Sequence, residues 1–248
     1  MPRPMPSLTL LALALAQPLS GRLAQLTGRG VSIERRSDAA HGAVTPAKGA
    51  FAIWGPIFAG GVAFALRSFR KDAARVPADR RLMLMNGLAF AGNSAWALQA
   101  QAVGLGWRSV AIISATAAAA VAATIDAETR RAHSAFARFA SRTSGPLAGW
   151  LTVASFANLD ATLVATRRSR DDETRRAVAL VGAAGATAAL MAAATRGNAG
   201  YVAASAWGLG AIALRNQRES RGAVVLTATL GLAAVAAATI FARRFRRS

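Results

Sequence analysis

A helix-length apolar segment, residues 146–158, carries the side chains best suited to hold a ligand. Trp150, Ala154 and Asn158 recur every four residues, so they share one face of a helix. A buried amide in hydrocarbon is costly without a partner, so Asn158 should face a bundle interior or a cavity. This stripe predicts either a ligand pocket with an aromatic wall and a small notch, or interhelix packing with Asn158 hydrogen-bonded across the bundle.

Two other apolar segments carry aromatic and amide side chains at helical spacing. One presents aromatic residues at i, i+3 and i+7, and the other presents an amide and an indole three residues apart. Each set has a structural alternative, namely an aromatic anchor at the membrane interface for the first and polar interhelix packing for the second. With the first stripe, they give the predicted ligand-binding residues: Phe51, Trp54, Phe58, Asn93, Trp96, Trp150, Ala154 and Asn158.

The motifs of common catalytic and metal sites are missing from the sequence. The chain has no cysteine, which excludes disulfides, thiol catalysis and cysteine metal sites. It also has no phosphate loop, nucleotide fingerprint, hydrolase elbow or carboxylate pair. His41 and His133 lie in polar stretches and are expected to be solvated. We therefore predict no catalytic residue, no metal site and no required cofactor, and do not expect an enzyme.

Three further polar or aromatic residues need a place. Asp160 lies roughly 9 Å from the expected helix end at Thr166, from a rise of about 1.5 Å per residue. It is expected to form an ion pair, for which Arg167 is the nearest candidate; an internal proton or cation site is the alternative. Trp107 opens a helix and is expected to anchor it at the interface. Trp207 lies in mid-helix, which favours core packing.

Composition places these segments in a membrane. The chain has 248 residues, of which 54% are hydrophobic, and its mean hydropathy is +0.33. Its apolar runs are about twenty residues long, enough to span a hydrocarbon core of about 30 Å. The formal charge of +19 comes from short basic clusters between these runs, which suits contact with anionic headgroups. We predict an integral membrane protein in a bilayer with anionic headgroups and expect no nucleic-acid partner.

Run length and the dominance of Ala and Leu predict eight apolar helices. Runs of small residues, such as 114–124 and 182–190, predict close helix packing. The first helix also resembles a secretory signal peptide, with small residues at Ala14 and Ala16. We expect it to be retained, with Pro18 kinking or ending it. The predicted helices are 7–26, 50–67, 82–103, 107–125, 145–166, 177–195, 199–214 and 222–242.

The long connection between the first two helices, residues 27–49, is rich in glycine and charge. It is long enough to fold over one end of the bundle as a lid. Lys and Arg are nearly balanced between the two sides of an eight-helix arrangement, so the sequence does not predict the membrane orientation.

Three segments, TPAKGAFAIWGPIF, NSAW and PLAGWLTVASFAN, in this order resemble the TspO/MBR family. These are the tryptophan-rich sensory proteins related to the mitochondrial benzodiazepine receptor. The family's second helix carries an aromatic, then V/I-W and another aromatic, and its third helix carries N-x-x-W. Its fifth helix carries P-x-x-x-W, a small residue four further on, and Asn after four more. The resemblance covers roughly residues 5–166 and includes all the predicted ligand-binding residues.

The chain also departs from this family. The family proper has five membrane helices, whereas three more are predicted here. The first loop of the family carries the signature W-x-P-P, and here only Thr45 and Pro46 precede the second helix. The family also has a tyrosine beside the fifth-helix proline, where this chain has Leu147. We therefore predict a divergent, extended branch, in which residues 1–166 form a TspO-like five-helix membrane domain. Residues 167–248 would add three transmembrane helices as a packing or partner-facing extension.

The resemblance implies a pocket inside the five-helix bundle, capped by the first loop, that binds porphyrins and related hydrophobic ligands. Sterol binding and porphyrin breakdown are attributed to some members. Indole walls and small residues suit a flat tetrapyrrole. Its propionates need cations, which the first loop could supply. No His or Cys lies within the predicted helices, so axial haem ligation is not expected. The candidate cations of the loop are Arg29, Arg35, Arg36 and Lys48.

We therefore predict an all-α, polytopic membrane helix bundle that acts as a ligand-binding sensory or regulatory protein. The main alternative is a transporter of a small hydrophobic or anionic solute, and an enzymatic porphyrin-degrading role is a third option. A bacterial cytoplasmic (inner) membrane is the expected location, and a homodimer is the oligomer that we consider.

Overall fold

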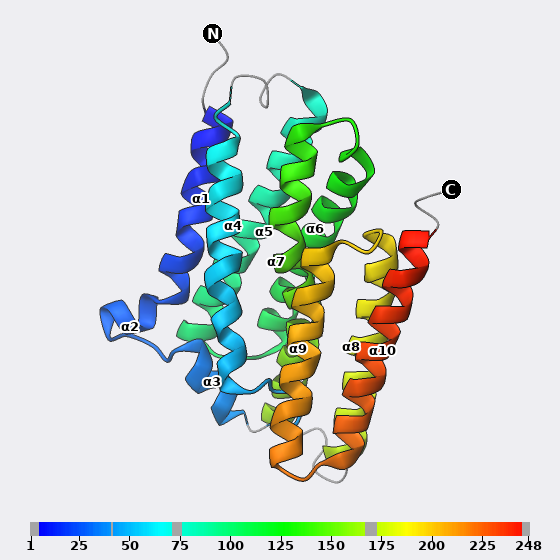
Figure 1. The fold of residues 1–248 in the computed structure, drawn as a ribbon. Coiled ribbons are helices and arrows are strands. Elements are labelled where there is room, and N and C mark those ends of the chain that lie inside the picture. The colour runs from blue at the N-terminus through cyan, green and yellow to red at the C-terminus, as the bar shows by residue number, and fades with distance from the viewer. Residues whose placement is uncertain (1–4, 41, 71–75, 167–172, 245–248) are drawn as a thin grey trace.

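The computed structural model describes residues 5–40, 42–70, 76–166 and 173–244. Within these ranges the chain forms ten α-helices and one 3₁₀ helix and no strand (Figure 1), which confirms the predicted all-α bundle. The elements are α1 (Met5–Gly21), α2 (Leu23–Thr27), α3 (Ile33–Ala39), η1 (Lys48–Ile53), α4 (Trp54–Arg67), α5 (Pro77–Ala102), α6 (Trp107–Arg130), α7 (Ala135–Ala165), α8 (Glu173–Ala194), α9 (Ala199–Arg218) and α10 (Gly222–Arg244).

All eight predicted apolar helices are present in the predicted order, but several boundaries differ by four residues or more. Two of these differences have a clear local cause. The first helix ends at Gly21 rather than at residue 26, three residues after Pro18, and the chain continues as the short α2. Helix α7 begins at Ala135 rather than at residue 145, because Ser134 caps it by accepting a hydrogen bond from the Ala137 amide at 3.1 Å. Pro146 therefore lies inside α7.

Five described helical segments are long and apolar enough to cross a membrane: residues 48–67, α6, α7, α8 and α10. Helix α1 is apolar but has only 17 residues. Helix α5 carries Asp79, Arg80 and Arg81 near its start, and α9 ends with Arg215 and Arg218, so both are more charged. The membrane-type bundle is confirmed, and membrane crossing by α1, α5 and α9 stays a prediction.

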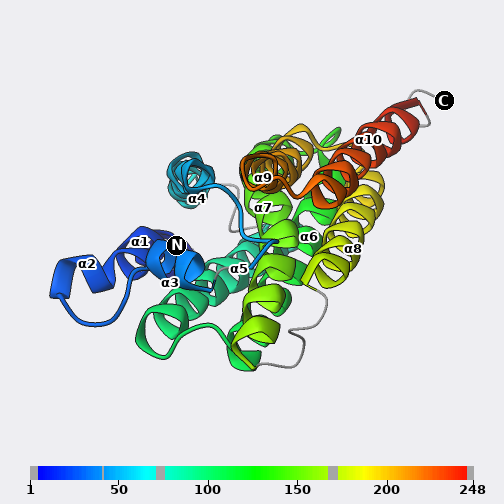
Figure 2. The same ribbon diagram turned by 90° about the horizontal axis from the view of Figure 1, so that it is seen from below.

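Helix α7 is the centre of the bundle. It packs against α4, α6, α8 and α9, with α5 and α1 beyond α6 and α4 (Figure 2). A single hydrophobic cluster runs through all eight long helices, from Leu10 in α1 to Val235 in α10. The segments 1–166 and 167–248 therefore share one core. Their predicted division of labour remains a prediction.

Small residues bring the helices into close contact. A methyl group on Gly149 of α7 would collide with the carbonyl oxygen of Tyr201 in α9. A Cβ on Gly185 of α8 would lie 2.7 Å from the Cα of Gly231 in α10. These positions therefore need glycine, and the predicted packing role of the small-residue runs is confirmed there.

Residues 42–50, which follow α3 and include the first three residues of η1, form a strap that crosses the end of the bundle. Asp160 of α7 is fully buried and accepts a hydrogen bond from the Val44 amide at 3.1 Å. It also forms an ion pair with Arg176 of α8, whose Nε lies 2.8 Å from Oδ1. The ion pair predicted for Asp160 is thus confirmed with a different partner, since Arg167 lies outside the described residues.

Helix α9 holds the same strap from the other side. Its contacts are hydrogen bonds from Asn216 Nδ2 to the Ala43 carbonyl (2.7 Å), from the Ala47 amide to the Ala211 carbonyl (3.1 Å) and from Trp207 Nε1 to the Ala50 carbonyl (2.9 Å). The strap leads directly into η1, which carries Phe51, and then into α4. The C-terminal helices therefore help to position the aromatic residues at the start of α4.

Candidate ligand-binding cavity

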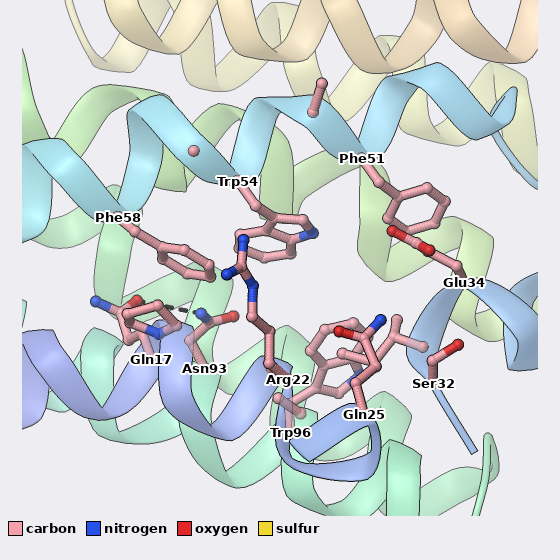
Figure 3. Close-up of a pocket in the computed structure, with 16 residues that line it drawn as sticks. Gln17, Arg22, Gln25, Ser32, Glu34, Phe51, Trp54, Phe58, Asn93 and Trp96 are labelled. Atoms are coloured by element: carbon pink, nitrogen blue, oxygen red, sulfur yellow. Dashed lines mark hydrogen bonds between the residues drawn. The ribbon is translucent and has the colours of Figure 1, made fainter.

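A cavity of about 320 Å³ lies between α1, the η1–α4 segment and α5. Residues of α2, α3 and the turn between them form its mouth, so the long connection covers this end of the bundle as predicted. Five of the eight predicted ligand-binding residues line the cavity, with their side chains directed into it from η1, α4 and α5 (Figure 3). These are Phe51, Trp54, Phe58, Asn93 and Trp96.

The aromatic wall of this cavity is one connected cluster centred on Trp54. The Trp54 ring is stacked on Phe58, with ring centroids 5.3 Å apart and planes inclined by 19°. It is stacked more loosely on Trp96, at 6.3 Å and 28°. On its other side it meets the edge of Trp150 at 6.0 Å and 81°. Trp54 is only half-buried, so one face of this cluster remains available to a flat ligand.

The three predicted residues of α7 lie behind this wall. Trp150, Ala154 and Asn158 line a second, smaller hollow of about 40 Å³, which shares Trp54 and Trp96 with the cavity. The Asn158 oxygen accepts a hydrogen bond from the Ser109 hydroxyl of α6 at 2.8 Å. The structure thus brings all eight residues together, but the α7 stripe supports the wall and does not line the main cavity.

Two buried amides meet across the cavity floor. Asn93 Nδ2 donates a hydrogen bond to Gln17 Oε1 of α1 at 3.1 Å (Figure 3), and both side chains are almost fully buried. Among the residues that the structure describes, the remaining polar atoms of this pair, Gln17 Nε2 and Asn93 Oδ1, have no hydrogen-bond partner, and neither has Trp96 Nε1. Buried polar groups are normally paired, so these unpaired atoms beside a cavity indicate a missing partner.

The mouth of the cavity is charged. Arg22, which ends the first apolar segment, directs its guanidinium into the cavity, and the Glu34 carboxylate of α3 lies opposite, near Phe51 (Figure 3). Both side chains are exposed. The cavity therefore joins an apolar, aromatic interior to a mouth that carries one cation and one anion.

None of the four cations predicted to serve a ligand is among the lining residues. Arg36 donates to the Gln101 carbonyl of α5 at 3.2 Å, which holds α3 onto the bundle. Lys48 forms an ion pair with Asp38 at 3.1 Å. Arg29 and Arg35 are exposed and do not line the cavity. Arg22, which is not one of these four, is the cation among the residues that line the cavity.

Sequence reasoning missed Gln17, Arg22 and Glu34. Gln17 was available from the argument already applied to Asn158, since a lone amide within an apolar helix needs a partner. Gln17 directly follows the candidate signal-peptide cleavage site at Ala14 and Ala16, and the sequence analysis considered it only in that context. Arg22 and Glu34 carried no such signal, because only the folded position of α2 and α3 brings them to the mouth.

The described residues include no cluster of His, Cys, Asp and Glu that could hold a metal ion. His133 is exposed, as predicted, and His41 lies outside the described residues. The lining groups are aromatic rings, amides and a single charge of each sign, which can bind and orient a ligand by stacking and hydrogen bonding.

Comparison with known proteins bears on this arrangement. A family model described as TSPO-like protein matches residues 7–242 of the chain. No curated protein and no solved structure matches it. The family match runs from α1 into α10, so it includes the cavity, the strap and the three C-terminal helices. The chain therefore belongs to the TSPO-like family and is an integral membrane protein.

Proposed function

We propose that this protein binds a flat hydrophobic ligand in the cavity between α1, α4 and α5 and acts as a sensory or regulatory protein of the membrane. The observation that carries the proposal is the set of three unpaired buried polar atoms, on Gln17, Asn93 and Trp96, beside an aromatic wall. Each unpaired buried group costs about 1–3 kcal/mol. A ligand with a donor and an acceptor at its polar edge would remove part of this cost.

A porphyrin-like molecule is the ligand class that we propose. The Trp54 and Phe58 rings are stacked in nearly parallel planes, and a flat ring can add to such a stack. The cavity of about 320 Å³ is at the lower end of the range of roughly 300–1,000 Å³ for small-molecule sites. A larger ligand would extend through the mouth, where Arg22 could bind a carboxylate.

The predicted location, partners and division of the chain form part of this proposal. We place the protein in a bacterial cytoplasmic membrane, where its basic loops contact anionic headgroups. The cavity is lined by residues of 1–166 alone. Residues 167–248 support it indirectly, because α9 holds the strap that leads to Phe51. The homodimer considered from the sequence remains a prediction.

Tryptophan-quenching titration with protoporphyrin IX tests the proposal. The wild-type protein in detergent should show saturable quenching, and Trp54→Leu should weaken affinity about tenfold, because it removes a stacking surface that sits at the cluster centre. Trp107→Phe is the matched control, since Trp107 is half-exposed at the start of α6 and does not line the cavity. Equal affinities in all three proteins would contradict the proposal.

A second measurement separates binding from the transport alternative. Proteoliposomes loaded with unlabelled porphyrin should show no counterflow of labelled porphyrin if the protein only binds its ligand. Counterflow that Trp54→Leu abolishes would replace the sensory function by transport through the same cavity.

A further inference from the structure

A second hollow, of about 880 Å³, lies on the outer face of the bundle between α9 and the strap–η1 segment. It is separate from the ligand cavity and shares no lining residue with it. Figure 2 shows α4 and α9 as neighbours on the same side of α7, and the hollow runs along α9 on that side. We call it the α9 groove.

The apolar part of the α9 groove is floored by small side chains. Ala203, Ala206 and Gly210 of α9 leave room along the helix, and Trp207 rises between them. Trp207 was predicted to lie in the core, and this was wrong, since half of its surface is exposed. Its indole N–H is satisfied by the Ala50 carbonyl at 2.9 Å, so the ring is fixed and presents only apolar surface to the groove.

The C-terminal end of the α9 groove is charged. Three cations, Lys48, Arg215 and Arg218, meet two carboxylates, Asp38 and Glu219, among its lining residues. Lys48 pairs with Asp38 at 3.1 Å and Arg215 pairs with Glu219 at 3.1 Å. Arg218 is exposed and has no acidic partner among the residues that the structure describes. This end therefore carries one positive charge in excess.

The dimensions of the α9 groove match one lipid of one leaflet. From Ala203 to Arg218 the helix rises about 22 Å, at about 1.5 Å per residue. Half of a hydrocarbon core of about 30 Å is about 15 Å, and a headgroup adds the remainder. The order of surfaces, from small apolar residues through an indole to cations, is also that of a phospholipid from acyl chain to phosphate.

We propose that the α9 groove binds one anionic phospholipid of the bilayer, with its phosphate at Arg218 and Lys48 and an acyl chain along Ala203 and Gly210 over Trp207. The single excess charge complements a headgroup of net charge −1. A zwitterionic lipid would bring its own cation to a surface that is already positive, so it should bind more weakly. The surface pair of Lys48 with Asp38 is easily exchanged, because Lys48 is largely exposed. This proposal does not depend on the ligand cavity.

Quenching of Trp207 by brominated lipids tests the proposal. The full chain is reconstituted in phosphatidylcholine vesicles with a minor fraction of phosphatidylglycerol, and either lipid carries bromine at the middle of its acyl chains. Subtracting the signal of Trp207→Phe isolates Trp207 from the other tryptophans. Brominated phosphatidylglycerol should quench Trp207 more strongly than brominated phosphatidylcholine at equal mole fraction.

Charge variants decide whether the basic end causes this preference. Arg218→Gln should lower the preference for phosphatidylglycerol about fivefold, and adding Lys48→Gln should abolish it. Arg142→Gln is the matched control, because Arg142 is an exposed arginine of α7 that does not line the groove. Equal quenching by both lipids in the wild-type protein would overturn the proposal, as would a preference that Arg218→Gln leaves unchanged. Arg218 is exposed, so this single variant is expected to fold.

Discussion

Asn216 on α9 should hold the strap in place, and its replacement by alanine tests that role. Its Nδ2 donates to the Ala43 carbonyl at 2.7 Å, and both residues are fully buried. Asn216→Ala leaves this carbonyl without its donor in a site that water does not reach. An unpaired buried carbonyl costs about 1–3 kcal/mol. The variant should therefore lower the free energy of opening the strap by about that amount.

Hydrogen exchange of peptides that cover residues 42–50 measures this effect. A loss of about 1–3 kcal/mol should speed exchange of the strap amides, such as those of Val44 and Ala47, about 5- to 150-fold. Asn86→Ala is the matched control. Asn86 is an almost fully buried asparagine of α5. Within the described part of the chain, its Nδ2 bonds only to the Leu82 carbonyl of its own helix, so strap exchange should stay as in the wild type.

Loosening the strap should also weaken ligand binding in the cavity. A loosened strap no longer fixes Phe51 and the start of η1, so porphyrin affinity should fall in Asn216→Ala and not in Asn86→Ala. Unchanged exchange at residues 42–50 in Asn216→Ala would refute the role of α9 in holding the strap. Faster exchange with unchanged porphyrin affinity would show that the strap does not position the cavity wall.

Three further predictions concern the cavity and its surroundings. Arg22→Gln should weaken binding of mesoporphyrin about fivefold in the same titration, because the free carboxylates of mesoporphyrin pair with the guanidinium. Binding of mesoporphyrin dimethyl ester, which has no free carboxylate, should stay unchanged. Equal effects on both ligands would exclude that pairing. Ala154→Leu adds a large side chain to a hollow of about 40 Å³ and should destabilise the protein by about 1–3 kcal/mol in denaturant titration, whereas Ala59→Leu on the exposed face of α4 should not. Mass spectrometry of the mature protein should find α1 retained, because its Leu10 and Ala14 are buried in the core of the bundle. A mature start near Gln17 would contradict this.

Much of the fold follows from run length and side-chain spacing. The eight apolar helices lie in the predicted order because runs of about twenty apolar residues have few alternatives to a membrane helix. Phe51, Trp54, Asn93 and Trp96 meet at one cavity because helical spacing already placed them on shared faces. The family resemblance, based on the same residues, was confirmed by a match over residues 7–242.

Contacts between distant elements could not be predicted from the sequence. The bond from Trp207 to the Ala50 carbonyl joins residues 157 positions apart, and no local pattern marks it. The same holds for Asp160, which forms an ion pair with Arg176 of the next helix. Helical spacing shows that Trp150, Ala154 and Asn158 face inward, but only packing decides that Trp54 stands between them and the main cavity.

The most direct test of the central claim replaces the two buried amides by apolar side chains of similar size. If Gln17 and Asn93 are kept for a ligand, then Gln17→Met with Asn93→Leu removes their unpaired polar atoms. The melting temperature in detergent should stay the same or rise, while protoporphyrin IX affinity falls about tenfold or more. A lowered melting temperature with unchanged affinity would mean that the pair only joins α1 to α5, and would contradict the proposed binding site.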